Sequence, residues 1–138
     1  MTFSDSTYSS SSEKIKTVEF PFGNFYLAEK YVVSEVNADT HIDWDKSTAV
    51  FDIIEEYYPK GHKIGFISNR INAYSSDPNY WSRLNSKYDC IAAFAIVSYS
   101  DLGYQNATLE KLFADRSLKR CSSLQEAIEW VLKLKELN

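Results

Sequence analysis

The alternation of hydrophobic and polar positions divides the chain into short strands and amphipathic helices. Near the N-terminus, apolar residues alternate with polar ones, which is the period of a half-buried strand. This pattern predicts two or three short antiparallel strands within 17–22, 25–28 and 31–36. The pairs Gly23-Asn24 and Glu29-Lys30 supply turn residues between them.

Helical periodicity begins in the middle of the chain and alternates there with strand-like segments. Apolar residues recur at the spacing of one buried stripe, which predicts helices over 43–58, 77–88, 106–115 and 124–136. Between them, strands are predicted over 62–68, 90–97 and 118–121. The nearly uninterrupted apolar segment 90–97 is typical of a central parallel strand that is covered on both faces.

This order of elements predicts an α/β fold. Strands that alternate with helices form right-handed crossovers and a largely parallel sheet. We therefore expect a mixed, mostly parallel sheet of four to five strands, with an antiparallel hairpin at the N-terminus and about four helices.

Two of the predicted helices carry strong start signals. Asp77 is a good N-cap and Pro78 suits the first turn that follows it. Ser123 and Glu126 have the spacing of a capping box, in which the hydroxyl and the carboxylate each reach the other residue's backbone N–H.

Composition divides the chain into a tail and one domain. Serine dominates residues 1–13, and their apolar content is too low for packing, so we expect a tail that is disordered or fixed only locally. Residues 14–138 fit a single domain, since domains most often have about 100–150 residues.

Charge and hydropathy bear on the class of partner and on location. The 15 Lys and Arg residues against 19 Asp and Glu leave a net charge of −4, which argues against nucleic acid as the main partner. No apolar segment approaches the roughly 20 residues of a membrane span. Because no charged and then apolar signal sequence opens the chain, we expect a cytoplasmic protein.

The sequence lacks the motifs of several enzyme classes. Its two His and two Cys residues match no metal-ligand spacing, and its four glycines form no phosphate-binding loop. A Gly-x-Ser-x-Gly motif is absent, and no catalytic triad can be assigned. We therefore predict a non-enzymatic protein with no catalytic residue, no metal and no cofactor, in which Cys90 and Cys121 are buried thiols.

One polar connection is a candidate binding site. It joins the carboxyl end of a predicted parallel strand to the next helix, the edge at which open α/β sheets bind ligands. Arg70 could hold a carboxylate or phosphate through two hydrogen bonds, and the helix N-terminus favours an anion or a phosphorylated side chain. The candidate binding residues are Asn69, Arg70, Asn72, Tyr74, Ser75 and Ser76. The alternative interpretation is a well-capped structural turn, since Asn, Ser, Asp and Pro are ordinary turn residues.

Aromatic residues are the other unusual feature. Ten Tyr, eight Phe and three Trp exceed what the centre of so small a core can hold. Tyr and Trp are enriched in interfaces, so the surplus favours a protein partner, and an exposed sheet edge is compatible with a homodimer. The alternative is a boundary layer with solvated hydroxyl groups.

The element order, Asn69-Arg70 after the third strand and the segment SSLQEAIEWV at 122–131 resemble STAS domains, specifically small bacterial SpoIIAA-like proteins. The resemblance spans residues 17–134 and implies a four- to five-stranded sheet, usually without catalysis. It also implies regulation by phosphorylation of a Ser or Thr where the helix after the third strand begins. Ser75 and Ser76 lie nearest that place, although the family's Asp-Ser-Ser/Thr signature is missing and the loop is longer.

Together these features predict a non-enzymatic regulatory or protein-binding module. Phosphorylation of Ser75 or Ser76 would add about two negative charges beside Asp77 and could switch the contact with a partner. The alternative is a small-molecule or lipid carrier similar to CRAL-TRIO proteins, which requires a sizeable apolar pocket.

Overall fold

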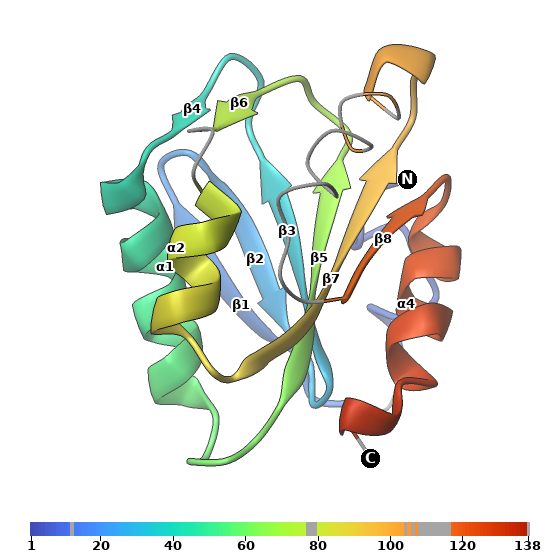
Figure 1. Cartoon of the computed structure of the whole chain (residues 1–138). Helices are drawn as coiled ribbons and strands as arrows, with labels where there is room; N and C mark the ends of the chain where they lie inside the picture. The colour runs from blue at the N-terminus through green and yellow to red at the C-terminus, as the bar shows by residue number, and fades with distance from the viewer. Residues whose placement is uncertain (12, 77–79, 104, 106, 108–116, 138) are drawn as a thin grey trace.

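A mixed sheet with helices on both faces forms the centre of the molecule (Figure 1). The computed structural model describes residues 1–11, 13–76, 80–103, 105, 107 and 117–137. Among these residues the main sheet has six strands. In spatial order they are β1 (Lys16–Phe20), β2 (Gly23–Leu27), β3 (Tyr31–Val36), β5 (Ile64–Arg70), β7 (Ile91–Ser98) and β8 (Ser117–Cys121).

The pairing of these strands confirms a mixed α/β fold with an antiparallel N-terminal part. Strands β1, β2 and β3 are antiparallel neighbours, whereas β3, β5, β7 and β8 are paired in parallel. The expected count of four to five strands is too low, because the terminal strands β1 and β8 each pair along five residues.

The predicted turn at Gly23-Asn24 is wrong by two residues. The chain reverses at Pro21-Phe22, and Gly23 already belongs to β2, where it pairs with Val36 of β3. A Cβ atom at Gly23 would lie 2.6 Å from the carbonyl oxygen of Glu35. Glycine is therefore needed here for close approach between two strands, a requirement that the sequence does not distinguish from a turn.

The helices divide between the two faces of the sheet (Figure 1). Helices α1 (Trp44–Tyr57) and α2 (Tyr80–Lys87) cover one face, and α4 (Leu124–Leu132) covers the other. The chain ends in a 3-10 turn, η1 (Lys135–Leu137), so the last helix is shorter than predicted. Of the predicted helix over 106–115, only Ala107 is described, and the predicted start at Asp77 and Pro78 lies outside the described residues.

Each face of the sheet carries its own hydrophobic layer. The layer under α1 and α2 includes Phe51, Phe66, Tyr88 and Phe94, all at most 4% exposed. The layer under α4 includes the other side of β5 and β7 and the apolar stripe of α4. A Cβ atom at Gly65 would lie 2.6 Å from a methyl carbon of Val131, so α4 packs closely on β5 at this glycine.

The N-terminal segment, residues 1–11, packs against the α4 side of the sheet. Phe3 is 1% exposed, and its ring stacks on Tyr26 with the ring centroids 4.8 Å apart. The backbone N–H of Phe3 donates to the Glu35 carboxylate at 2.7 Å. One buried ring and a buried carboxylate thus hold this serine-rich segment to the sheet.

A small second sheet lies beyond the ends of the parallel strands (Figure 1). It consists of the two-residue strands β4 (His41–Ile42) and β6 (Ser75–Ser76), paired in parallel with His41 opposite Ser75. We call this pair the β4–β6 ribbon. A loop is expected at Ser75 and Ser76 from the sequence, because strands this short leave no periodic pattern. No helix among the described residues is both long and apolar enough to cross a membrane.

Candidate functional site

The predicted binding residues Asn69 and Arg70 lie in a strand and not in a loop. Strand β5 continues through Arg70, two residues beyond the predicted end. Because successive side chains of a strand point to opposite faces, the sheet separates these two residues. Asn69 belongs to the α4 side, where it is 1% exposed, whereas Arg70 lines a pocket on the α1 side.

Asn69 holds the N-terminal segment in place. Its amide nitrogen donates to the Glu35 carboxylate at 2.7 Å and to the carbonyl oxygen of Met1 at 2.9 Å. Its amide oxygen accepts from the Tyr99 hydroxyl at 2.6 Å. Since both amide hydrogens and the amide oxygen have partners within the fold, the structure gives Asn69 a structural role.

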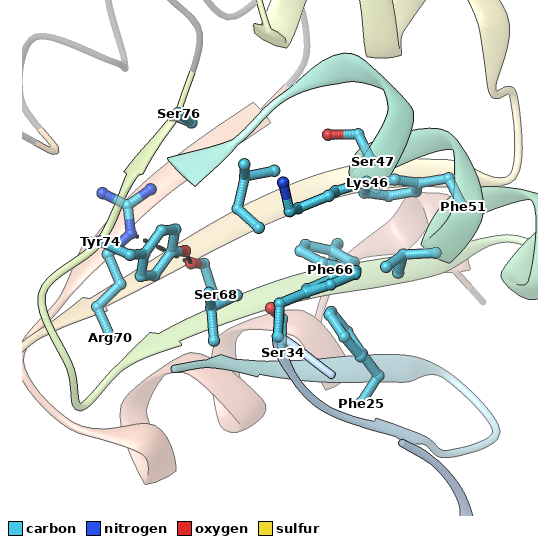
Figure 2. A pocket seen from close by; sticks show the side chains of 14 residues that line it. Phe25, Ser34, Lys46, Ser47, Phe51, Phe66, Ser68, Arg70, Tyr74 and Ser76 are labelled. Atoms are coloured by element: carbon cyan, nitrogen blue, oxygen red, sulfur yellow. Dashed lines mark hydrogen bonds between the residues drawn. The ribbon is translucent and has the colours of Figure 1, made fainter. Parts of the chain in front are cut away.

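The pocket on the other side lies between the first turns of α1 and the carboxyl ends of β3 and β5 (Figure 2). We call it the edge pocket. Its volume is about 30 Å³. The rings of Phe25, Phe51 and Phe66 form its apolar wall, and serine, lysine, arginine and tyrosine side chains form the polar part. The edge pocket is therefore small and has two chemically distinct sides.

Three serines cross the sheet beside the edge pocket, one from each of the neighbouring strands β3, β5 and β7. Ser34 of β3 pairs with Ser68 of β5. Ser98 of β7 pairs with Arg70, which lies two residues beyond Ser68 in β5 and therefore on the same face of the sheet. All three are buried, with exposures of 4%, 4% and 6%. The Ser68 hydroxyl lies 2.7 Å from the Tyr74 hydroxyl and accepts a hydrogen bond from Arg70 Nε at 3.2 Å. We call Ser34, Ser68 and Ser98 the serine row.

Two hydroxyls of the serine row are not used by the fold. Ser34, which lines the edge pocket, makes no side-chain hydrogen bond in the part of the chain that the structure describes. Ser98 Oγ is fully buried and likewise lacks a partner there. A buried hydroxyl without a partner costs about 1–3 kcal/mol, so this edge carries polar groups that do not stabilise the protein.

Positive charge gathers around the edge pocket. The guanidinium of Arg70 lies over the Tyr74 ring, 5.4 Å from its centroid. Lys46, in the first turn of α1, lies 3.4 Å from the Asp43 carboxylate. Asp43 caps α1 by accepting from the backbone N–H of Lys46, and this hydrogen bond lowers the pKa of its carboxyl group. The dipole of α1 adds partial positive charge at the same end.

The remaining predicted residues lie on the ribbon and on the segment that leads to it. Ser76 is half-buried and lines the edge pocket, whereas Ser75 is exposed and does not line it. The Ser75 hydroxyl lies 2.7 Å from Nδ1 of His41. Asn72 is exposed and donates to the carbonyl oxygen of Val36 at 3.3 Å.

The structure therefore brings Arg70, Tyr74 and Ser76 together and places Asn69 elsewhere. No motif in the sequence marks Lys46, His41 or the serine row as site residues. The signal for the serine row is that each serine follows an apolar run in its strand, at 31–33, 64–67 and 91–97. The His41–Ser75 contact joins residues 34 positions apart and leaves no such signal.

Other chemistry is limited among the described residues. They contain no group of three His, Cys, Asp or Glu side chains that could hold a metal ion. Cys90 and Cys121 do not form a disulfide. Cys121 is buried as predicted, whereas Cys90 is half-buried, and burial raises the pKa of the Cys121 thiol to about 11. The edge pocket is an order of magnitude smaller than the roughly 300–1,000 Å³ of small-molecule pockets, so it cannot hold a lipid chain.

Comparison with known proteins identifies the fold. No family model and no curated protein matches this sequence. A solved structure does: an uncharacterised protein of the DUF3478 family from Shewanella loihica PV-4, described as having a SpoIIAA-like fold. The TM-score is 0.53 at 11% sequence identity, over 86% of this chain and 93% of that one. The fold is SpoIIAA-like.

This result confirms the resemblance inferred from the sequence. The SpoIIAA-like architecture extends over most of both chains. At 11% identity the likeness establishes the fold and carries no activity from one protein to the other. The function of this SpoIIAA-like module must therefore be argued from its own site.

Proposed function

We propose that this chain is a non-enzymatic regulatory module that binds a protein partner at the carboxyl edge of its sheet. The contact surface consists of Arg70, Asn72, Tyr74, Ser75 and Ser76. The observation that carries this proposal is the β4–β6 ribbon, which presents an exposed hydroxyl next to the arginine and tyrosine of the edge pocket. Arg and Tyr are the residue types that most often dominate binding at protein interfaces.

The geometry favours binding over catalysis. Ser75 and His41 have the separation of a nucleophile and a base, but Ser75 does not line the edge pocket. The pair is exposed to water on the ribbon. A catalytic hydroxyl needs a site beside it in which the reacting group is held and the developing charge is stabilised. The pocket and the pair face different ways, since neighbouring residues of a strand alternate.

We propose Ser75 as the residue that regulates this contact. It is exposed, whereas Ser76 is half-buried, so Ser75 is the more accessible phosphate acceptor. A phosphate adds about −1.5 to −2 charge, and here the charge would lie against the His41 imidazole. The local charge of the surface that contacts a partner would become more negative, which supports a role for Ser75 as a switch.

The test is affinity capture with a matched set of variants. Wild type, Arg70→Ala and Ser75→Glu are immobilised beside Lys133→Ala, an exposed cation after α4 on the opposite face. We expect wild type and Lys133→Ala to capture the same partner protein, and Arg70→Ala and Ser75→Glu to lose it. Equal recovery by all four proteins would remove the carboxyl edge from the function.

A further inference from the structure

We propose that the N-terminal segment, residues 1–11, is an intramolecular ligand of a peptide-binding site, and that a partner segment with the pattern Xaa-Xaa-Phe can replace it there. On the α4 side of the sheet this site consists of Tyr26, Tyr31, Glu35, Asn69 and Tyr99. We call it the segment site. The inference goes beyond the proposed function, because the segment site and the edge pocket lie on different faces of the sheet.

The polar part of the segment site binds peptide backbone. The Glu35 carboxylate accepts from the backbone N–H of Phe3 at 2.7 Å. The carbonyl oxygen of Met1 accepts from the Asn69 amide at 2.9 Å and from the Tyr99 hydroxyl at 3.2 Å. Since every peptide carries N–H and C=O groups, these contacts can hold a segment of another sequence in the same way.

One aromatic ring supplies the sequence preference. Phe3 is 1% exposed and is the only hydrophobic residue of 1–11 that is buried to this degree. Its ring stacks on Tyr26 with centroids 4.8 Å apart and meets Tyr31 edge-on at 6.4 Å, both favourable geometries for aromatic pairs. A competing segment therefore needs a phenylalanine two positions after the carbonyl group that Asn69 binds.

The polar groups of the segment site are oriented without the segment. Asn69 donates to the Glu35 carboxylate at 2.7 Å and accepts from the Tyr99 hydroxyl at 2.6 Å. Neither bond involves residues 1–11, so both persist when the segment leaves. Groups that are fixed in advance bind a peptide at a lower entropic cost, which favours exchange of one segment for another.

The segment itself is a separable unit. None of residues 1–11 belongs to a paired strand, so no backbone ladder joins the segment to the sheet. Its serine hydroxyls bond largely within the segment, as Ser6 does to the Phe3 carbonyl and Ser9 to the Ser6 carbonyl. The Phe3 ring thus dominates docking, and its removal should shift the balance toward the released segment about a hundredfold.

The experiment measures binding of the segment as a separate peptide. The probe is a labelled, N-acetylated peptide of residues 1–8, MTFSDSTY, and fluorescence anisotropy reports its binding. The full chain with Phe3→Ala should bind the probe at about 10–100 μM, the millimolar effective concentration of a short linker divided by the hundredfold preference for docking. Wild type should bind about a hundredfold more weakly, because its own segment competes. Asp5→Ala is the matched control, since it retains the ring and should bind as wild type does.

Variants of the probe and of the site test the individual contacts. A probe with alanine in place of Phe3 should bind the Phe3→Ala chain about a hundredfold more weakly. Adding Tyr99→Phe to that chain removes one backbone contact and should weaken the intact probe about fivefold. Adding Arg70→Ala should leave its affinity unchanged, because Arg70 lies on the other face of β5 from Asn69.

A measurement on wild type decides the proposal if Phe3→Ala does not fold. At about 10 mM of the unlabelled peptide, the NMR signal of the Phe3 amide should move to its position in a free segment. The proposal is overturned by the absence of probe binding to a folded Phe3→Ala chain, by equal binding of the alanine probe, or by an unchanged Phe3 signal in wild type. Partner capture that depends on Arg70 would leave the proposed function standing in each of these cases.

Discussion

At the residue scale, the hydroxyl groups of the serine row differ in whether they form hydrogen bonds within the protein. Ser68 is tied to Tyr74 and Arg70, whereas Ser34 and Ser98 have no partner among the described residues. All three stand at the carboxyl ends of adjacent parallel strands, the place where α/β proteins bind ligands. Stability alone would favour alanine at Ser98, whose hydroxyl is fully buried without a partner in the described part of the chain.

Ser98→Ala should stabilise the protein by about 1 kcal/mol, because it removes a buried hydroxyl without a partner and keeps the Cβ atom. Urea unfolding of wild type and variant measures the difference, with Ser86→Ala on the surface of α2 as the control. A loss of more than about 1 kcal/mol would show that the Ser98 hydroxyl does have a stabilising partner.

Asp43 makes the start of α1 sensitive to acid. The backbone N–H of Lys46 holds the pKa of this carboxyl group below its ordinary value. The stabilisation is therefore present above the unfolded pKa of about 3.9 and is lost as the pH falls through the lower folded value. Asp43→Asn keeps a capping oxygen and should show a flatter melting temperature between pH 5 and pH 2, at roughly unchanged stability near pH 7. Parallel pH profiles would speak against this role of Asp43.

At the element scale, the N-terminal segment acts as an additional layer of the fold. Phe3 is buried among Tyr26 and Tyr31, while Glu35 and Asn69 bind the backbone of Phe3 and Met1. These contacts close the face of the sheet opposite the edge pocket.

Phe3→Ala should destabilise the protein by about 3 kcal/mol, at the lower end of the cost of emptying a buried phenylalanine site, because the segment can detach. Urea unfolding measures this loss. Asp5→Ala, an exposed change in the same segment, serves as the control. Equal stability of Phe3→Ala and wild type would mean that the segment does not pack in solution.

Elements with a local period could be predicted from the sequence. The apolar stripe of α1 is confirmed, as are β3, β8 and the parallel β7. The capping box of α4 is half correct. The Ser123 hydroxyl accepts from Glu126 N, but the Glu126 carboxylate accepts from Ser122 N at 2.9 Å. The Glu126 side chain is long enough to reach either backbone N–H, so the residue pattern alone does not show which of the two it binds.

Long-range contacts could not be predicted in the same way. The β4–β6 ribbon pairs two dipeptides that have no periodicity of their own. The three serines of the serine row are far apart in the sequence. Only the register of the pairing between β3, β5 and β7 shows that they are neighbours. Asn69 and Arg70 resemble turn residues by type, and only the length of β5 shows that they occupy opposite faces.

At the scale of the whole molecule, buried tyrosines set the alkaline limit of stability. Burial is the main cause that raises the pKa values of Tyr31, Tyr58 and Tyr88, and a hydrogen bond to Asp52 adds to it for Tyr88. Their phenols stay neutral in the folded protein but ionise at about pH 10 in the unfolded chain. Stability from these groups is thus complete below pH 10 and is lost as the pH rises toward the folded values.

Melting temperature should therefore fall steeply above about pH 10. Tyr58→Phe should lessen the fall, and the half-exposed neighbour Tyr57→Phe should leave it as in wild type. Thermal unfolding between pH 8 and pH 11 checks both. A flat profile in wild type would show that the three phenols are accessible to water.

For the whole molecule, the proposed function places partner binding at the carboxyl edge of the sheet, and hydrogen exchange can locate the contact. The chain alone is compared with its complex with a partner that wild type captures and Arg70→Ala does not. We predict slower amide exchange over residues 70–76 and 41–42, with no change in α4. Protection of α4 with unchanged exchange at the β4–β6 ribbon would contradict the account.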